Sequence, residues 1–130
     1  MLWKISAWET LSVLSKNITL YGRDRRMKVL INGYPFKVKF VDGNSHKMKP
    51  DKDHYNLGLV ECADGVIRIR KGMNRRITRS TVIHELTHAF IFAFGYTIEG
   101  EEAMCDFFGS QGDDIIQMAD LIMKEAKMKC

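Results

Sequence analysis

The residues with the clearest chemistry are the HELTH sequence at positions 84–88, which matches the HExxH pattern. Residues four apart lie on one face of an α-helix, so the imidazoles of His84 and His88 can bind one ion. Glu85 lies about 100° further round the helix, within reach of a water on that ion. Two neutral imidazoles and an open position suit Zn²⁺, which lowers the pKa of its bound water to about 7. The pattern predicts a zinc-activated water with Glu85 as general base, the chemistry of peptide-bond hydrolysis.

A catalytic zinc site needs a third protein ligand. No histidine follows His88, so the metzincin pattern is absent, and the candidates are downstream carboxylates. We favour Glu102, because Asp106 follows it by about one helical turn on the same face. One carboxylate can then bind the metal while the other accepts a hydrogen bond from a ligand histidine. Glu101 and Glu99 remain alternatives for the third ligand.

Peptide hydrolysis also needs a donor for the developing oxyanion and a surface for the substrate. The candidate donors are Tyr55, Tyr96, His54 and Arg79. The edge of the strand predicted at residues 66–70 would bind an extended peptide by β-addition. Arg68 and Arg70 on that strand would favour acidic residues in the substrate, although a solvated face explains them equally well.

The HExxH residues are predicted to lie on a helix from Thr78, as N-cap, to Gly95, just past its end. Two β-hairpins are predicted before it. Residues 27–31 pair with 34–41 across Asn32-Gly33, and residues 57–62 pair with 66–70. Residues 42–56 are predicted to be an exposed loop, and residues 17–26 a polar connection.

Further helices are predicted at residues 6–16, 99–110 and 113–127, with one long helix as an alternative for the last two. Strands grouped before helices indicate an α+β fold, with a small antiparallel sheet of two hairpins packed on helices and a central HExxH helix. The 130 residues are expected to form a single domain, residues 1–130.

The composition, 45% hydrophobic and 28% charged, is typical of a globular protein and excludes disordered and collagen-like classes. No apolar run approaches the roughly 18 residues of a membrane span, and no signal peptide is apparent. Cys62, Cys105 and Cys130 are widely spaced without a CxxC pattern, which favours a reducing compartment. We therefore expect a cytoplasmic protein that makes no membrane contact.

The net charge of +4 hides an uneven distribution, because the first 80 residues are basic and the last 50 are acidic. A basic surface attracts nucleic acids or acidic proteins, although solvated faces are the simpler explanation. Direct nucleic-acid binding is disfavoured, since the basic strands lack interleaved aromatic residues and no helix-turn-helix pattern is present.

The two motifs together resemble a known family. HExxH followed by ExxxD on a second helix is the gluzincin pattern, here at residues 84–88 and 102–106. With the preceding strand pair, the segments ITRSTVIHELTHAF and EEAMCDFFG resemble small phage and mobile-element metallopeptidases of the ImmA/IrrE type. The resemblance covers residues 57 to about 128, and family members often have Asn at the position of Asp106.

This resemblance implies a minimal gluzincin-like fold and an intracellular zinc endopeptidase. Its implied substrate is a cytoplasmic protein, such as a regulatory, DNA-binding repressor of a phage or mobile element. A second hypothesis from a different class is a non-catalytic zinc-containing protein that binds a partner protein or nucleic acid. Loss of Glu85 distinguishes the two, because only an enzyme needs its general base.

Overall fold

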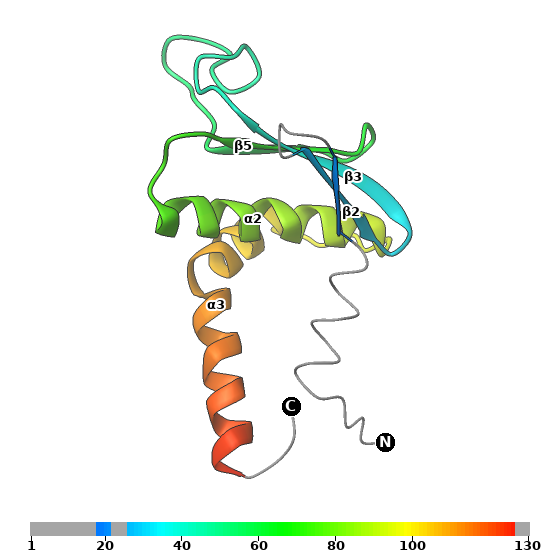
Figure 1. Ribbon diagram of the computed structural model, residues 1–130, viewed down its shortest axis with the longest axis vertical. Coiled ribbons are helices and arrows are strands. Elements are labelled where there is room, and N and C mark those ends of the chain that lie inside the picture. Colours follow the sequence, from blue (N-terminus) through cyan, green and yellow to red (C-terminus); the bar gives the residue numbers. More distant parts are fainter. Residues whose placement is uncertain (1–17, 22–25, 127–130) are drawn as a thin grey trace.

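The computed structural model describes residues 18–21 and 26–126, and within them it has an α+β architecture, as predicted. A sheet lies on one side of helix α2, and helix α3 packs on the other side (Figure 1). The elements are β1 (Ile18–Tyr21), β2 (Arg26–Ile31), β3 (Tyr34–Val41), β4 (Gly58–Glu61), β5 (Val66–Arg70), α2 (Arg75–Ala93) and α3 (Glu101–Glu125).

A tight turn joins β2 to β3 in antiparallel register, with Ile31 opposite Tyr34. Asn32 and Gly33 at its centre have φ values of 49° and 81°. Both residues therefore adopt the left-handed conformation that an Asn-Gly type I′ turn requires. β4 and β5 also pair antiparallel, with Glu61 opposite Val66.

The sheet as a whole is mixed, so the prediction of an entirely antiparallel sheet is wrong. The strand order is β1-β2-β3-β5-β4, and the central pair β3 and β5 is parallel. The connection between them, which includes β4, returns the chain to the same end of the sheet. This pairing sets Val38 beside Ile67 and buries both side chains. β5 consequently lies inside the sheet and β4 forms its edge.

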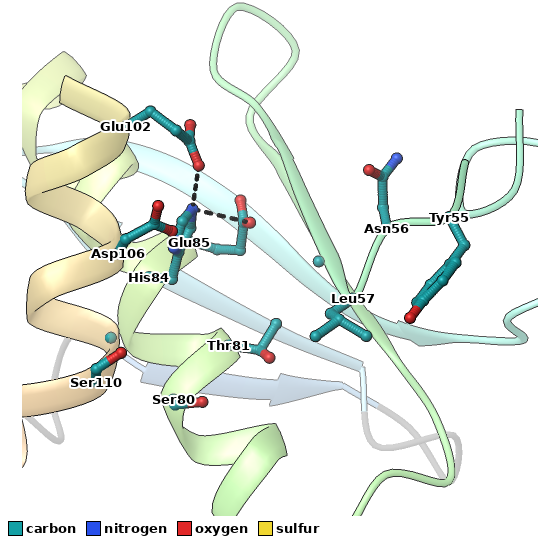
Figure 2. Close-up of a pocket in the computed structure, with 12 residues that line it drawn as sticks. Tyr55, Asn56, Leu57, Ser80, Thr81, His84, Glu85, Glu102, Asp106 and Ser110 are labelled. Carbon is teal, nitrogen blue, oxygen red and sulfur yellow. Dashed lines mark ion pairs between the residues drawn. The ribbon is translucent and has the colours of Figure 1, made fainter. Parts of the chain in front are cut away.

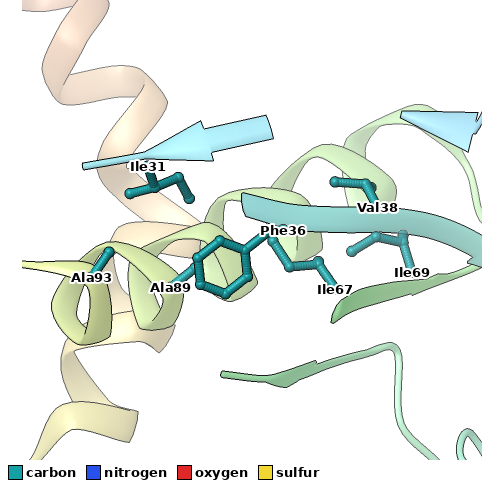
Figure 3. Packing of buried hydrophobic residues seen from close by; sticks show 7 residues of the cluster. All are labelled: Ile31, Phe36, Val38, Ile67, Ile69, Ala89 and Ala93. Carbon is teal, nitrogen blue, oxygen red and sulfur yellow. The ribbon is translucent and has the colours of Figure 1, made fainter. Parts of the chain in front are cut away.

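The hydrophobic core lies between the sheet and α2 (Figure 3). Alternate residues of the strands point into it, as the period-two pattern requires. Small residues of α2 complete it, because Ala89 and Ala93 let the helix lie close to the strands. The buried cluster consists of Ile31, Phe36, Val38, Ile67, Ile69, Ala89 and Ala93.

The helix α2 begins about one turn earlier than predicted. Its N-cap is Asn74, whose side-chain oxygen accepts a hydrogen bond of 2.9 Å from the backbone N–H of Ile77. Thr78 lies inside the helix, where its hydroxyl donates to the carbonyl of Met73. At the other end Gly95 has a φ of 73°, in agreement with its predicted position just past the helix.

The helix α3 is continuous from Glu101 to Glu125, which favours the alternative of one long helix over two short ones. The glycines at its centre do not interrupt it. A Cβ atom on Gly109 would lie 2.9 Å from the carbonyl oxygen of Ser80 on α2. This glycine therefore permits the two helices to approach closely.

The remaining predictions concern the beginning of the chain and the long loop. The helix predicted at residues 6–16 lies outside the described residues. The polar connection predicted at residues 17–26 instead contains β1, which pairs with β2 from Ile18 to Tyr21. The loop at residues 42–56 is mostly exposed, but Met48 is completely buried.

In the described part of the chain, neither helix combines the length and apolar character that crossing a membrane requires.

Candidate metal centre

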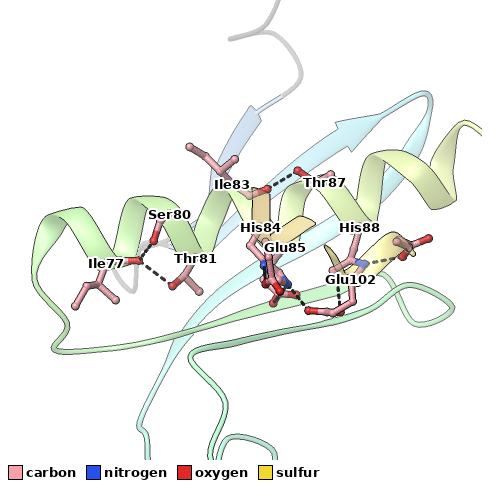
Figure 4. A network of polar contacts seen from close by, with 11 residues as sticks. Ile77, Ser80, Thr81, Ile83, His84, Glu85, Thr87, His88 and Glu102 are labelled. Carbon is pink, nitrogen blue, oxygen red and sulfur yellow. Dashed lines mark hydrogen bonds and ion pairs between the residues drawn. The ribbon is translucent and has the colours of Figure 1, made fainter. Parts of the chain in front are cut away.

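The helices α2 and α3 bring His84, His88 and Glu102 together (Figures 2 and 4). One carboxylate oxygen of Glu102 lies 2.9 Å from Nε2 of His84, and the other lies 3.1 Å from Nε2 of His88. The three donor atoms lie within 4.8 Å of one another. This trio is the ligand set favoured from sequence, and its donor types suit Zn²⁺ in a three-ligand site.

Each histidine ring also faces a further carboxylate through Nδ1, the ring nitrogen that does not face Glu102. Nδ1 of His84 lies 3.1 Å from Asp106, and Nδ1 of His88 lies 2.6 Å from Glu101. A carboxylate that accepts the Nδ1 proton fixes the ring orientation and leaves the Nε2 lone pair free for a metal. Both rings are therefore oriented with Nε2 toward Glu102.

The role of Glu101 is one that sequence reasoning missed. Glu101 was an alternative third ligand, but the structure places it on the Nδ1 side of His88, away from Nε2. Glu101 and Asp106 lie five residues apart on α3, about 140° round the helix, so they do not share the i,i+4 spacing of the two histidines. No spacing in the sequence indicated that Glu101 would be the partner of His88. Glu99, the other alternative, is exposed and is not part of the cluster.

The carboxylates also change the proton affinity of the site. Burial lowers the pKa of His88, but the hydrogen bond to Glu101 and the charges of Glu102, Glu85 and Glu101 raise it more, so the net shift is upward. A proton and a metal ion compete for Nε2. Metal binding at this site is therefore expected to weaken as the pH falls.

Glu85 lies beside the three donors without joining them. Its side chain is buried, and its nearest carboxylate oxygen is 3.9 Å from Nε2 of His84. Burial raises the pKa of Glu85, while the two histidines and a backbone hydrogen bond at Val60 oppose that rise. A carboxylate with a raised pKa close to, but outside, a metal site is suited to accept a proton from a metal-bound water.

Gly58 determines how closely β4 approaches Glu85. A Cβ atom at this position would lie 2.7 Å from Cγ2 of Thr81 and 2.8 Å from Cγ of Glu85. Any side chain there would displace β4 or the general-base candidate. The sequence signal was a glycine within a predicted strand, which often marks a close approach by another group.

A pocket of about 330 Å³ opens next to the cluster, between β4 with its preceding segment and the two helices. Hydroxyl and amide groups form much of its wall. Figure 2 shows Tyr55 at the end of the pocket away from His84. The lining residues are Tyr55, Asn56, Leu57, Gly58, Ser80, Thr81, His84, Glu85, Glu102, Asp106, Gly109 and Ser110.

The structure separates the candidate oxyanion donors. Tyr55 lines the pocket, whereas Tyr96 is 67% exposed and does not. His54 bonds to Asp51 outside the pocket. Arg79 also does not line it, because its guanidinium binds the carboxylate of Asp113 on α3.

Arg68 and Arg70 lie on the face of the sheet opposite α2, since Ile67 and Ile69, which alternate with them along β5, point into the core. Arg68 forms an ion pair with Glu61. Arg70 donates a hydrogen bond to the carbonyl of Gly43 and lies over the ring of Tyr55. Neither arginine lines the pocket.

The prediction that residues 66–70 form a sheet edge is wrong, because β5 pairs with β3 on one side and β4 on the other. The edge strand beside the pocket is β4, which contacts α2.

The sequence matches no protein-family model and no curated protein, and the structure matches no solved structure.

Proposed function

We propose that this protein is a zinc-dependent endopeptidase that uses the His84, His88 and Glu102 cluster. The observation that supports this most directly is the orientation of both imidazoles. Each Nε2 faces the carboxylate of Glu102, and each Nδ1 has its own carboxylate partner. A solvated helix surface with incidental histidines does not require such paired orientation.

In this proposal His84, His88 and Glu102 hold the metal, and Asp106 and Glu101 orient the two rings. Bound zinc would supply an acidified water and polarise the substrate carbonyl. Glu85 accepts the proton of the attacking water and delivers it to the leaving amine. Its burial keeps the carboxylate next to the cluster, and Gly58 leaves it room on the β4 side.

An extended protein segment is the substrate that fits the surroundings of the site. β4 is the edge strand next to the pocket, and no described strand pairs with its outer side. Backbone groups on such an edge can bind a peptide as an additional strand. Of the candidate oxyanion donors, Tyr55 is the one that lines the pocket, and it lies at the end away from His84 (Figure 2).

The resemblance to ImmA/IrrE-type metallopeptidases extends the proposal to a cytoplasmic protein substrate, such as a DNA-binding repressor of a phage or mobile element. The charge of Arg68 and Arg70 does not support a preference for acidic substrates, because neither side chain lines the pocket and each has a partner elsewhere, Glu61 for Arg68 and the carbonyl of Gly43 for Arg70.

The first test is the zinc content of the purified protein after dialysis against a defined low concentration of zinc. We expect one zinc per chain in the unmodified protein and loss of that zinc in His84→Ala and Glu102→Gln. Retention of full stoichiometry in both variants would exclude this cluster as the metal site.

The second test separates an enzyme from a zinc-containing binding protein. Glu85→Gln keeps the metal ligands but lacks the general base, so it is the matched control. Unmodified protein and Glu85→Gln are each incubated with a bacterial lysate, and new protein N-termini are identified by mass spectrometry. Cleavage that depends on Glu85 supports the peptidase. Zinc binding without any Glu85-dependent cleavage supports the non-catalytic alternative.

A further inference from the structure

The pocket beside the metal centre extends along α2 toward the start of that helix. Ser80 and Thr81 line it about one turn before His84 (Figure 2). Ser110 lines the same part, because it follows Gly109, the residue of α3 that packs on the carbonyl of Ser80. The volume of about 330 Å³ is at the small end of the range for ligand pockets, so it suits one side chain of a bound peptide.

The neutral groups of the pocket wall offer mainly hydrogen-bond acceptors. The hydroxyls of Ser80 and Thr81 both donate to the carbonyl of Ile77, over 3.1 and 2.8 Å (Figure 4). The side-chain amide of Asn56 donates to the carbonyl of Lys47 over 3.1 Å. A hydroxyl that donates keeps its lone pairs, and the amide keeps its carbonyl oxygen. These groups can therefore accept hydrogen bonds from a ligand that carries donors.

The charged groups of the pocket lining are acidic. Glu85, Glu102 and Asp106 line the pocket, and no lysine or arginine of the described residues does. A divalent ion at the proposed metal site would balance only part of the negative charge of these carboxylates. Arg79 lies outside the lining, and its guanidinium is paired with Asp113. Charge and hydrogen bonding therefore favour the same kind of ligand group, a cation that donates hydrogen bonds.

We propose that this pocket receives a lysine or arginine side chain of the substrate, next to the bond that is cleaved. The inference rests on the proposed function, because it concerns the specificity of the same site. Ammonium and guanidinium groups carry several donors and no acceptor, which complements an acceptor-rich wall. Arg70 lies over the ring of Tyr55, at the end away from His84. The cationic group of the substrate is therefore expected between the two ends, beside Ser80 and Ser110.

A nuclear magnetic resonance titration tests the inference without any cleavage. The purified protein, dialysed against zinc as above, is titrated with Nα-acetyl-lysine methylamide and with its norleucine counterpart, which lacks only the ammonium group. We expect the backbone amide signals of Asn56, Ser80 and Ser110 to shift with the lysine compound, at a midpoint concentration about 10-fold lower than with the norleucine compound. Equal midpoints, or no shift of these signals with the lysine compound, would overturn the inference.

Ser110→Lys introduces a competing cation into the pocket lining, so it should abolish the difference between the two compounds. Gln111→Lys is the matched control, because it adds the same charge at the next position of α3, which is exposed and does not line the pocket. It should retain the preference for the lysine compound. An equal loss in both variants would indicate a general effect of charge and would overturn the assignment to this pocket.

The lysate experiment described above separates failure of this inference from failure of the peptidase. Sites whose cleavage depends on Glu85 should carry Lys or Arg next to the cleaved bond, and Ser110→Lys should lose that preference. Glu85-dependent cleavage without the preference would overturn the inference and leave the peptidase intact. Selective binding of the lysine compound without such cleavage would overturn the peptidase and assign the pocket to a basic residue of a bound partner.

Discussion

Oδ1 of Asp106 lies 3.1 Å from Nδ1 of His84, the ring nitrogen that points away from Glu102. Asp106 and Glu102 are one turn apart on α3, so a single helix supplies both a ligand and the partner that orients another ligand. The distance between α2 and α3 therefore controls the metal site directly.

Asp106→Ala is expected to weaken zinc binding by about 10–100-fold, because the imidazole of His84 loses the acceptor that fixes its orientation. Titration against a chromogenic chelator measures the change. Asp114→Ala is the matched control, an exposed aspartate further along the same helix, and it should leave the affinity unchanged. Equal affinities for both variants would show that Asp106 does not orient His84.

Glu101→Gln is expected to lower the pKa of His88, since Glu101 provides a hydrogen bond that raises it. The raised pKa means that the folded metal-free protein retains a proton that the unfolded chain releases. The resulting stability is fully present below pH 6.5, the ordinary value, and is lost as the pH rises through the pKa of folded His88.

An NMR titration of the imidazole in metal-free protein measures this pKa, and thermal melts across the same pH range measure the stability. Glu99→Gln, an exposed neighbour outside the cluster, is the control and should change neither. A pKa of His88 that is the same in Glu101→Gln and in the unmodified protein would contradict the assignment.

Gly109→Ala is expected to reduce both stability and zinc affinity. Ala in place of Gly gains roughly 1 kcal/mol of helix propensity, but overpacking typically costs about 1–3 kcal/mol. The added Cβ would lie 2.9 Å from the carbonyl oxygen of Ser80 and 3.2 Å from Cβ of His84, so α3 has to move away from the ligand.

Gly112→Ala is the matched control for that substitution on the same helix. Its added Cβ would meet only the side chain of Phe108, which is partly exposed and can rotate away. Chemical denaturation and zinc titration of both variants provide the comparison. If Gly112→Ala weakened zinc binding as much as Gly109→Ala, the approach of α3 to Ser80 and His84 would not be the cause.

Cys105 is expected to resist alkylation in the folded protein. It is completely buried, and burial together with the neighbouring carboxylates raises the pKa of its thiol to about 12, so almost no thiolate forms at pH 8. In a Cys130→Ser background, mass spectrometry should detect iodoacetamide on Cys62 before Cys105. Denaturant should abolish the difference, whereas rapid labelling of Cys105 under native conditions would contradict this packing.

Much of the local structure followed from the sequence because short-range geometry determines it. Asn32-Gly33 forms the turn expected of an Asn-Gly pair, and Gly95 ends α2 with a positive φ. The spacing of His84 and His88 is a property of a single helix, and α2 includes both residues. The ExxxD spacing likewise placed Glu102 and Asp106 on one face of α3.

Tertiary packing determined which strands pair with each other and which carboxylates on α3 contact the histidines on α2. The pattern of alternating residues is the same whichever strand lies beside β3, and burial of Ile67 against Val38 selected the parallel neighbour β5 and left β4 at the edge. Each histidine ring has two nitrogens that could face a carboxylate, and the sequence does not show which one does. The close approach of α3 to α2 at Gly109 places Glu101 next to Nδ1 of His88. Spacing along the chain specifies which residues share a face, but contact between two faces depends on packing across the whole fold.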